Sequence, residues 1–211
     1  IVAELQAVQK KYAVPRRTEI VYEYQTAAAE DAEDETPDYP VHVFCSREGY
    51  FKKITNQSLR MSADQKLKEG DSITQSVTAT KRSELLFFTD KCQVYKTTAA
   101  DFDDTKASVL GDYLPAKLGM DSGENPVFMA VTTDYQGYLL FAFENGKVAK
   151  VPLSAYATKT RRRKLANAYS DKARLVQALQ LAEDCEVLFT SSDTRMLIVH
   201  SGLIPAKVTK D

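Results

Sequence analysis

Four short apolar runs, each followed by a polar turn and a second strand-like segment, recur along the chain. The clearest copy is LLFFTDKCQVYK at 85–96, and related copies are VHVFCSREGYFKK at 41–53, LLFAFENGKVAK at 139–150 and VLFTSSDTRMLIV at 187–199. The most apolar runs are too short for typical helices and too continuous for half-exposed strands. We therefore expect hairpins whose first strands are buried on both faces.

The four turns can be aligned with one another. The aligned positions are Gly49, Cys92, Gly146 and Thr194, which are separated by 43, 54 and 48 residues. The Asn145-Gly146 pair carries the residue types that best tolerate positive φ. A period of this size built from strands indicates the blades of a propeller-like fold or another repeat array.

Lysines close three of the four hairpins, namely Lys52 and Lys53, Lys96, and Lys150. The segment 147–151 mixes lysines with apolar residues, and we interpret it as a strand with one packed face and one face in water. Lysines on edge strands can serve only to prevent strand-to-strand aggregation. Their recurrence at one repeat position favours instead a shared functional rim.

The segment before the first hairpin has two parts. Ile1, Leu5, Val8 and Tyr12 form one apolar stripe, which predicts a helix over 1–13 that ends before Pro15. The helix starts without a cap, so we expect a fragment whose stripe packs on a missing part or another chain. The alternative is a short amphipathic helix on this domain's own surface. Alternation over 20–24 predicts a strand.

Charge is distributed unevenly although the formal net charge is only -1. Six acids and no bases occupy 26–40, and the remaining residues carry 28 basic against 23 acidic side chains, or +5. This acidic stretch has too few apolar residues to order itself, so we expect a flexible loop or linker. The acids are Glu30, Asp31, Glu33, Asp34, Glu35 and Asp38.

Basic residues concentrate between the third and fourth hairpins. The stretch 147–174 holds nine basic residues and one acid, with its peak in KTRRRK at 159–164. This density is typical of surfaces that contact phosphate backbones, although charge runs are usually solvated loops. Tyr156 and Tyr169 flank the peak and either add contacts or belong to the core.

Motifs of catalysis and metal binding are absent from the sequence. There is no GxxxxGK, GxSxG, HExxH or GxGxxG motif, and His42 and His200 are remote from any cysteine pair, so we expect no metal. The three unclustered cysteines predict reduced thiols in a cytoplasmic protein. No signal peptide or membrane-spanning run is found. Acids around 101–104 leave a sugar-cleaving enzyme as a minor alternative.

Four segments in order resemble a known family. They are PRRTEI at 15–20, GYFKKI at 49–54, ELLFFTDKCQVYKTTAADF at 84–102 and GKVAKVPLSAY at 146–156. They resemble the C-terminal domain of the A subunit of bacterial type IIA DNA topoisomerases, a family that comprises DNA gyrase and topoisomerase IV. The resemblance implies an all-β fold, a β-pinwheel of four-stranded antiparallel blades preceded by a short N-terminal helix.

The resemblance also implies a domain organisation. Residues 1–14 would be the end of a coiled-coil helix from the upstream core domain, and 15–211 would be the pinwheel, with about four hairpin repeats and an acidic loop at 26–40. Such domains often have five or six blades, so either the fragment is truncated near Asp211 or the disc is smaller. The family's glycine-rich basic box has no counterpart in 56–71, where Gly70 is the single glycine. This departure favours topoisomerase IV or a weakly wrapping gyrase.

The resemblance further implies a non-catalytic, DNA-bending fragment without a cofactor. The family's catalytic tyrosine follows an arginine in the core domain, and no Arg-Tyr pair occurs here. The expected partners are double-stranded DNA, the core of the same chain and the ATPase-bearing B subunit, in a cytoplasmic, nucleoid-associated enzyme without membrane contact. The alternative is a propeller-type protein-interaction module without DNA binding. The predicted DNA-binding residues are Arg16, Arg17, Lys52, Lys53, Lys96, Lys147, Lys150, Lys159, Arg161, Arg162, Arg163 and Lys164.

Overall fold

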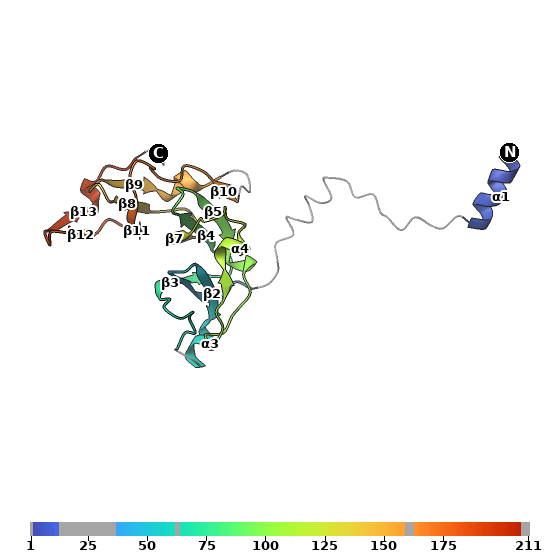
Figure 1. The fold of residues 1–211 in the computed structure, drawn as a ribbon, viewed down its shortest axis with the longest axis horizontal. Coiled ribbons are helices and arrows are strands. Elements are labelled where there is room, and N and C mark those ends of the chain that lie inside the picture. Colours follow the sequence, from blue (N-terminus) through green and yellow to red (C-terminus); the bar gives the residue numbers. More distant parts are fainter. Residues whose placement is uncertain (1, 13–36, 62–63, 159–162, 208–211) are drawn as a thin grey trace. The chain divides into compact units, whose positions relative to one another are not determined.

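The computed structural model describes residues 2–12, 37–61, 64–158 and 163–207 (Figure 1). The chain divides between Pro37 and Asp38 into two units, which are described separately. In the first unit, α1 (Val2–Tyr12) confirms the predicted N-terminal helix, and its apolar side chains are exposed. The predicted strand at 20–24 and most of the acidic stretch lie outside the described residues.

The second unit is built from four antiparallel sheets, which we number in chain order. Sheet 1 has the strand order β3-β1-β2-β6 and consists of β1 (Pro40–Ser46), β2 (Tyr50–Thr55), β3 (Ile73–Thr80) and β6 (Asp112–Tyr113). Sheet 2 has the order β10-β5-β4-β7 and consists of β4 (Glu84–Thr89), β5 (Val94–Thr98), β7 (Pro126–Thr132) and β10 (Lys164–Leu165). Sheet 3 has the order β11-β8-β9 and consists of β8 (Tyr138–Phe143), β9 (Val148–Pro152) and β11 (Leu175–Leu181). Sheet 4 consists of β12 (Glu186–Thr190) and β13 (Met196–His200).

Short helical segments connect these strands. The α-helical ones are α3 (Asn56–Met61) and α4 (Leu114–Lys117). A 3-10 turn follows the second strand of the hairpin in sheets 2, 3 and 4, and these turns are η1 (Ala99–Asp101), η2 (Leu153–Tyr156) and η3 (Ser201–Leu203).

Each of the four apolar runs forms the first strand of a hairpin, as predicted. The aligned turn residues all have left-handed backbone conformations, with φ of 82° at Gly49, 56° at Cys92, 75° at Gly146 and 65° at Thr194. In sheets 1, 2 and 3 a third strand pairs with the first strand of the hairpin. The repeat inferred from the sequence is therefore a structural repeat.

The chain that leaves one hairpin returns to the edge of the preceding sheet. β6 lies between β5 and β7 in the sequence, yet it pairs with β2 of sheet 1. In the same way β10 follows the hairpin of sheet 3 and pairs with β5 of sheet 2. Neighbouring sheets are therefore linked by shared strands as well as by packing.

The core lies between successive sheets. The four residues of β4 from Leu85 to Phe88 are all 0% exposed. Leu85 and Phe87 belong to a cluster shared with sheet 1, whereas Leu86 and Phe88 belong to a cluster shared with sheet 3. This arrangement confirms that the strand is buried on both faces, because each face packs against a different neighbouring sheet.

Candidate nucleic-acid interface

Three lysines occupy the same repeat position, four residues after the left-handed turn residue. They are Lys53, Lys96 and Lys150, on β2, β5 and β9, and we call them the clasp lysines. Lys53 is 2% exposed and Lys150 is 4% exposed, and the side chain of Lys96 is 11% exposed. The prediction that they face water on a shared rim is wrong, because the chain returning from the next sheet covers this edge.

Each clasp lysine binds that returning chain. The ammonium of Lys53 forms an ion pair of 3.0 Å with Asp104, just after η1. Lys96 donates to the Tyr156 carbonyl oxygen, at the end of η2, at 3.1 Å. Lys150 donates to the Ser201 carbonyl oxygen, at the start of η3, at 3.1 Å and to Asp184 Oδ1 at 2.5 Å. The recurrence that the sequence displays is thus a repeated contact between neighbouring sheets.

Lys52 is also internal. It is 3% exposed, and its ammonium donates to the carbonyl oxygens of Lys66 at 2.6 Å and Ala107 at 3.2 Å. Burial lowers the pKa of Lys52, since loss of water destabilises the charged form. Lys52 and the clasp lysines therefore do not belong to the accessible cationic surface.

The basic peak at 159–164 is only partly described. Arg163 and Lys164 are exposed. Lys164 forms an ion pair of 2.9 Å with Asp121, and its hydrogen bonds with Asp121 and Tyr95 raise the pKa of Lys164. Five other predicted residues lie outside the described part of the chain, namely Arg16, Arg17, Lys159, Arg161 and Arg162.

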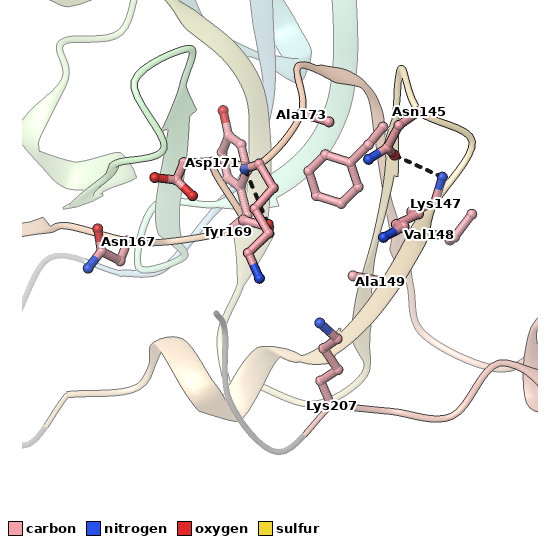
Figure 2. Close-up of a pocket in the computed structure, with 12 residues that line it drawn as sticks. Asn145, Lys147, Val148, Ala149, Asn167, Tyr169, Asp171, Ala173 and Lys207 are labelled. Carbon is pink, nitrogen blue, oxygen red and sulfur yellow. Dashed lines mark hydrogen bonds between the residues drawn. The ribbon is translucent and has the colours of Figure 1, made fainter.

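The exposed cations of sheet 3 surround a groove along β9. Lys147, Lys172 and Lys207, which we call the groove lysines, line this groove of about 560 Å³ together with Phe143 and Tyr169. Figure 2 shows Lys147 and Lys207 extending into the same open space from different segments. The three are exposed, and within the described residues no side-chain hydrogen bond or ion pair engages their ammonium groups.

Only one of the groove lysines is among the residues predicted from the sequence. Lys172 lies within the basic stretch but outside the predicted set, and Lys207 lies 33 residues beyond the end of that stretch at Arg174. A backbone hydrogen bond of 2.8 Å from the Lys207 N–H to the Lys150 carbonyl oxygen brings this distant residue to β9. The basic density of 147–174 is a signal for Lys172, whereas no local pattern identifies Lys207.

The electrostatics of the groove favour anions. One acid, Asp171, also lines it, so three cations face one anion. Because the groove lysines have no described partner, a phosphate or carboxylate can bind them without displacing a protein contact. Tyr156 and Tyr169 are 0% and 3% exposed, so they belong to the core.

Nothing in the described residues suggests a metal site or a membrane span. Within 2–12, 37–61, 64–158 and 163–207 no group of three histidine, cysteine, aspartate or glutamate side chains is placed to hold a metal. The Nδ1 atom of His200 accepts a hydrogen bond from the Gly202 N–H, and that of His42 lies 3.4 Å from Thr78 Oγ1. Across the same ranges no helix has the length and apolarity that crossing a membrane requires.

Comparison with curated proteins finds relatives that share much of this sequence. The chain is 29% identical over 163 residues to the A subunit of DNA gyrase from Streptomyces coelicolor, covering 72% of the chain and 19% of the relative. It is 24% identical over 206 residues to the A subunit of DNA gyrase from Staphylococcus aureus, covering 92% of the chain and 23% of that relative. The chain thus spans about a fifth of the length of these relatives. No protein-family model matches it.

Solved structures share the fold. The C-terminal domain of DNA topoisomerase IV superposes with a TM-score of 0.68 and 21% identity, over 83% of this chain and 55% of that one. The E. coli ParC C-terminal domain gives a TM-score of 0.61 and 18% identity, over 80% of this chain and 68% of that one. The fold is the β-pinwheel of type IIA topoisomerase A subunits. The resemblance drawn from the four sequence segments is therefore confirmed.

The pinwheel explains where accessible charge lies. In sheets 1 and 2 the returning chain covers the second strand of the hairpin, so the lysines of that strand bind other parts of the protein. On β9 the described residues cover the edge only as far as Lys150, and the groove lies along the rest. The candidate interface is therefore the groove lysines, and Arg163 and Lys164 are further exposed cations at the edge of sheet 2.

Proposed function

We propose that this pinwheel binds and bends duplex DNA for a type IIA topoisomerase, presenting it for ATP-dependent strand passage. The observation that carries the proposal is the set of exposed groove lysines without described partners. Lysines that neutralise phosphates release condensed counterions, which gives strong and salt-dependent binding. The similarity to gyrase A subunits supports the same reading.

The binding would be independent of DNA sequence. Lysine ammonium groups contact phosphates as point charges, and such contacts position a protein on the duplex without reading base edges. A curved array of these contacts favours bent over straight DNA. The proposed role is therefore to hold duplex DNA in a bent path for the enzyme.

The proposal assigns the chemistry to other parts of the enzyme. The catalytic tyrosine would lie in the core domain of the same polypeptide, and the ATP site on the partner B subunit, so the pinwheel itself would need no cofactor. The enzyme would act in the cytoplasm on nucleoid DNA. Whether the parent is a gyrase or a topoisomerase IV would follow from the extent of DNA wrapping.

The test is a salt titration with a duplex of about 40 base pairs. Fluorescence anisotropy would compare the wild type with a triple variant carrying Lys147→Ala, Lys172→Ala and Lys207→Ala. We expect weaker binding and a salt slope that is shallower by about 3, since each phosphate contact contributes about 0.9 to the slope. A second variant carrying Arg163→Ala and Lys164→Ala should show a smaller change, because Lys164 is already paired with Asp121.

A matched control separates position from total charge. Lys66, Lys68 and Lys106 are exposed residues of the connections around sheet 1, and a triple alanine variant of them removes the same charge. If both triple variants lose affinity equally, net charge rather than the β9 groove determines binding. Absence of binding by the wild type at low salt would refute the DNA function altogether.

The acidic stretch at 30–38 supplies a further proposal on regulation. Its six carboxylates would compete with DNA for the basic surface. Residues 30–36 of this stretch lie outside the described part of the chain. Deleting 28–36 should then tighten DNA binding at low salt and have little effect at high salt, because screening weakens the competition. Unchanged affinity at low salt would make this stretch a simple spacer.

A further inference from the structure

The returning chain meets each clasp lysine in the same register. The residues that face the clasp lysines each lie five positions after the first residue of η1, η2 or η3, and they are Asp104, Thr158 and Ala206. The first forms the ion pair with Lys53 and also a parallel backbone bridge with it. The second accepts a hydrogen bond of 3.1 Å from the Lys96 ammonium at Oγ1. The third forms a parallel backbone bridge with Lys150.

The residue that follows this facing position is held through its backbone. In sheet 1 the Thr105 N–H donates to the Lys53 carbonyl oxygen at 2.7 Å. In sheet 3 the Lys207 N–H donates to the Lys150 carbonyl oxygen at 2.8 Å. Lys207 therefore occupies the place that Thr105 occupies in sheet 1, but with a charged side chain instead of a neutral one.

Lys150 holds both ends of the segment that carries Lys207. Its ammonium binds the carbonyl oxygen of Ser201, which is 0% exposed, at the start of the segment. Its own carbonyl oxygen binds the Lys207 N–H at the end of the segment. Of residues 202–207 only Ile204 is half-buried, and the others are exposed. Side-chain packing therefore contributes little to the position of Lys207, and the bonds of Lys150 determine it.

We infer that Lys150 is a positioning residue for DNA binding, although its own side chain is 4% exposed and does not reach the surface. It holds the returning chain so that Lys207 lies with Lys147 at the groove along β9, as Figure 2 shows. The inference rests on the proposed function, in which the groove lysines contact phosphates. Lys53 makes the equivalent contact in sheet 1 but holds the uncharged Thr105, so it should have no such role.

Hydrogen exchange tests the positioning without DNA. In Lys150→Met the Lys207 amide should exchange faster than in the wild type by roughly tenfold or more, because the segment opens locally, while the Thr105 amide keeps its rate. In Lys53→Met the reverse is expected. Each variant is thus the control for the other, since global unfolding would raise both rates together. Unchanged exchange of the Lys207 amide in Lys150→Met would overturn the inference whether or not the chain binds DNA.

Salt titrations with a duplex of about 40 base pairs measure the consequence for DNA binding. We expect Lys150→Met to make the salt slope shallower by about 0.9, which is the contribution of one phosphate contact. In the Lys150→Met background Lys207→Ala should change the slope little further, whereas Lys147→Ala should still reduce it by about 0.9. Lys53→Met should leave the slope unchanged, and urea unfolding would show that each variant is folded under the conditions of the titration.

A charge swap separates the position of Lys207 from the total charge of the segment. The variant that carries Ala206→Lys with Lys207→Ala keeps the net charge and moves one ammonium to the neighbouring residue. We expect it to show the shallower slope of Lys207→Ala, because successive side chains of an extended segment point to opposite sides.

The outcomes distinguish this inference from the proposed function. Equal effects of Lys207→Ala in the wild-type and Lys150→Met backgrounds would overturn the inference, since Lys207 would then bind DNA without help from Lys150. A wild-type slope for the charge swap would also overturn it, because the position of the charge would not matter. If the wild type does not bind DNA at low salt while the Lys207 amide still exchanges faster in Lys150→Met, the proposed function fails, and Lys150 stabilises the segment without a role in DNA binding.

Discussion

Two lysines three residues apart in the hairpin of sheet 3 have opposite environments. Lys147 is exposed and has no described side-chain partner, whereas Lys150 is 4% exposed and holds Asp184 and the Ser201 carbonyl oxygen. The position of Lys150 is a lysine in sheets 1, 2 and 3, whereas the position of Lys147 is Tyr50 in sheet 1, Gln93 in sheet 2 and Arg195 in sheet 4. The difference teaches that the lysine repeated in three successive sheets makes a contact between neighbouring sheets, whereas Lys147 lies on the surface.

The left-handed turn residues support the same conclusion. Their position recurs in all four hairpins, and its role is to shape the backbone. In a repeat fold each unit contacts its neighbours in the same way, so selection for that contact acts at the same position in every unit. The predictions below test whether the clasp lysines are structural and the groove lysines are not.

The largest effect is expected for Lys150→Met. Methionine keeps the approximate length of the side chain but loses both bonds of the ammonium. These are the bond to Asp184 and the bond to the carbonyl oxygen of Ser201, a residue that is 0% exposed and whose carbonyl then keeps only the bond from the Ile204 N–H. We expect the free energy of unfolding to fall by about 2 to 3 kcal/mol. Urea unfolding at pH 7 measures this change as a lower midpoint at constant slope.

Lys147→Met is the matched control for that experiment. It is an exposed substitution in the same hairpin, and we expect a change within about 0.5 kcal/mol. Equal losses for the two variants would contradict the distinction between clasp and groove lysines.

A smaller loss is expected for Lys53→Met. The side chain of Lys53 is 3% exposed, but its partner Asp104 is 38% exposed and also accepts a hydrogen bond of 2.7 Å from Tyr39. The carboxylate therefore keeps one partner and contact with water, and we expect the free energy of unfolding to fall by about 1 to 2 kcal/mol. A loss greater than that of Lys150→Met would mean that the exposure of the partner does not set the strength of the clasp.

The hairpins and the turn position could be predicted from the sequence because both depend on local pattern. The apolar runs at 85–88 and 139–143 are buried by neighbouring sheets, and the turn residues adopt the expected left-handed backbone. Because Lys147 and Lys150 are three residues apart, a strand places them on opposite faces, but the local pattern does not indicate which of the two meets water. Which face meets water depends on chain that returns from the next sheet, more than 30 residues away.

The candidate site was harder to predict than the fold. The basic stretch correctly indicated a cationic surface near Lys147, but Lys207 joins that surface through a long-range backbone hydrogen bond. Recurrence pointed to the clasp lysines, which the fold uses internally. The DNA-binding role of the exposed residues stays a prediction.

Thr194 occupies the recurring left-handed turn position in the hairpin of sheet 4, and replacing it tests the backbone cost of a side chain at this position. Thr194 is β-branched and exposed and has φ of 65°, a conformation that costs little only for glycine. We expect Thr194→Gly to raise the free energy of unfolding by about 0.5 to 1 kcal/mol, since relief of strain outweighs the added freedom of the unfolded chain. Thermal unfolding would show the gain.

Gly146→Ala is the reverse substitution at the same turn position and serves as its control. A Cβ at Gly146 would meet no atom within 4 Å, so its cost comes from the backbone at φ of 75° alone. We expect a loss of about 1 kcal/mol. A stabilising Gly146→Ala would show that the left-handed turn is not required by the hairpin.

The smallest expected effect is on stability against unfolding at acidic pH. The hydrogen bond from the Lys150 ammonium, followed by that from the Ser201 hydroxyl, lowers the pKa of Asp184. A carboxylate with a lowered pKa stabilises the folded state above its ordinary pKa, and this contribution is lost as the pH falls through the folded value. Between about pH 5 and pH 2 the wild type should therefore lose slightly more stability than Asp184→Asn, as measured by unfolding midpoints across that range. In a Lys150→Met background Asp184→Asn should alter the acid profile less, because the larger cause of the lowered pKa is gone and the hydrogen bond from the Ser201 hydroxyl remains. If the profile changes there as much as in the wild-type background, Lys150 does not set the ionisation of Asp184, and the clasp is not the source of the pH dependence.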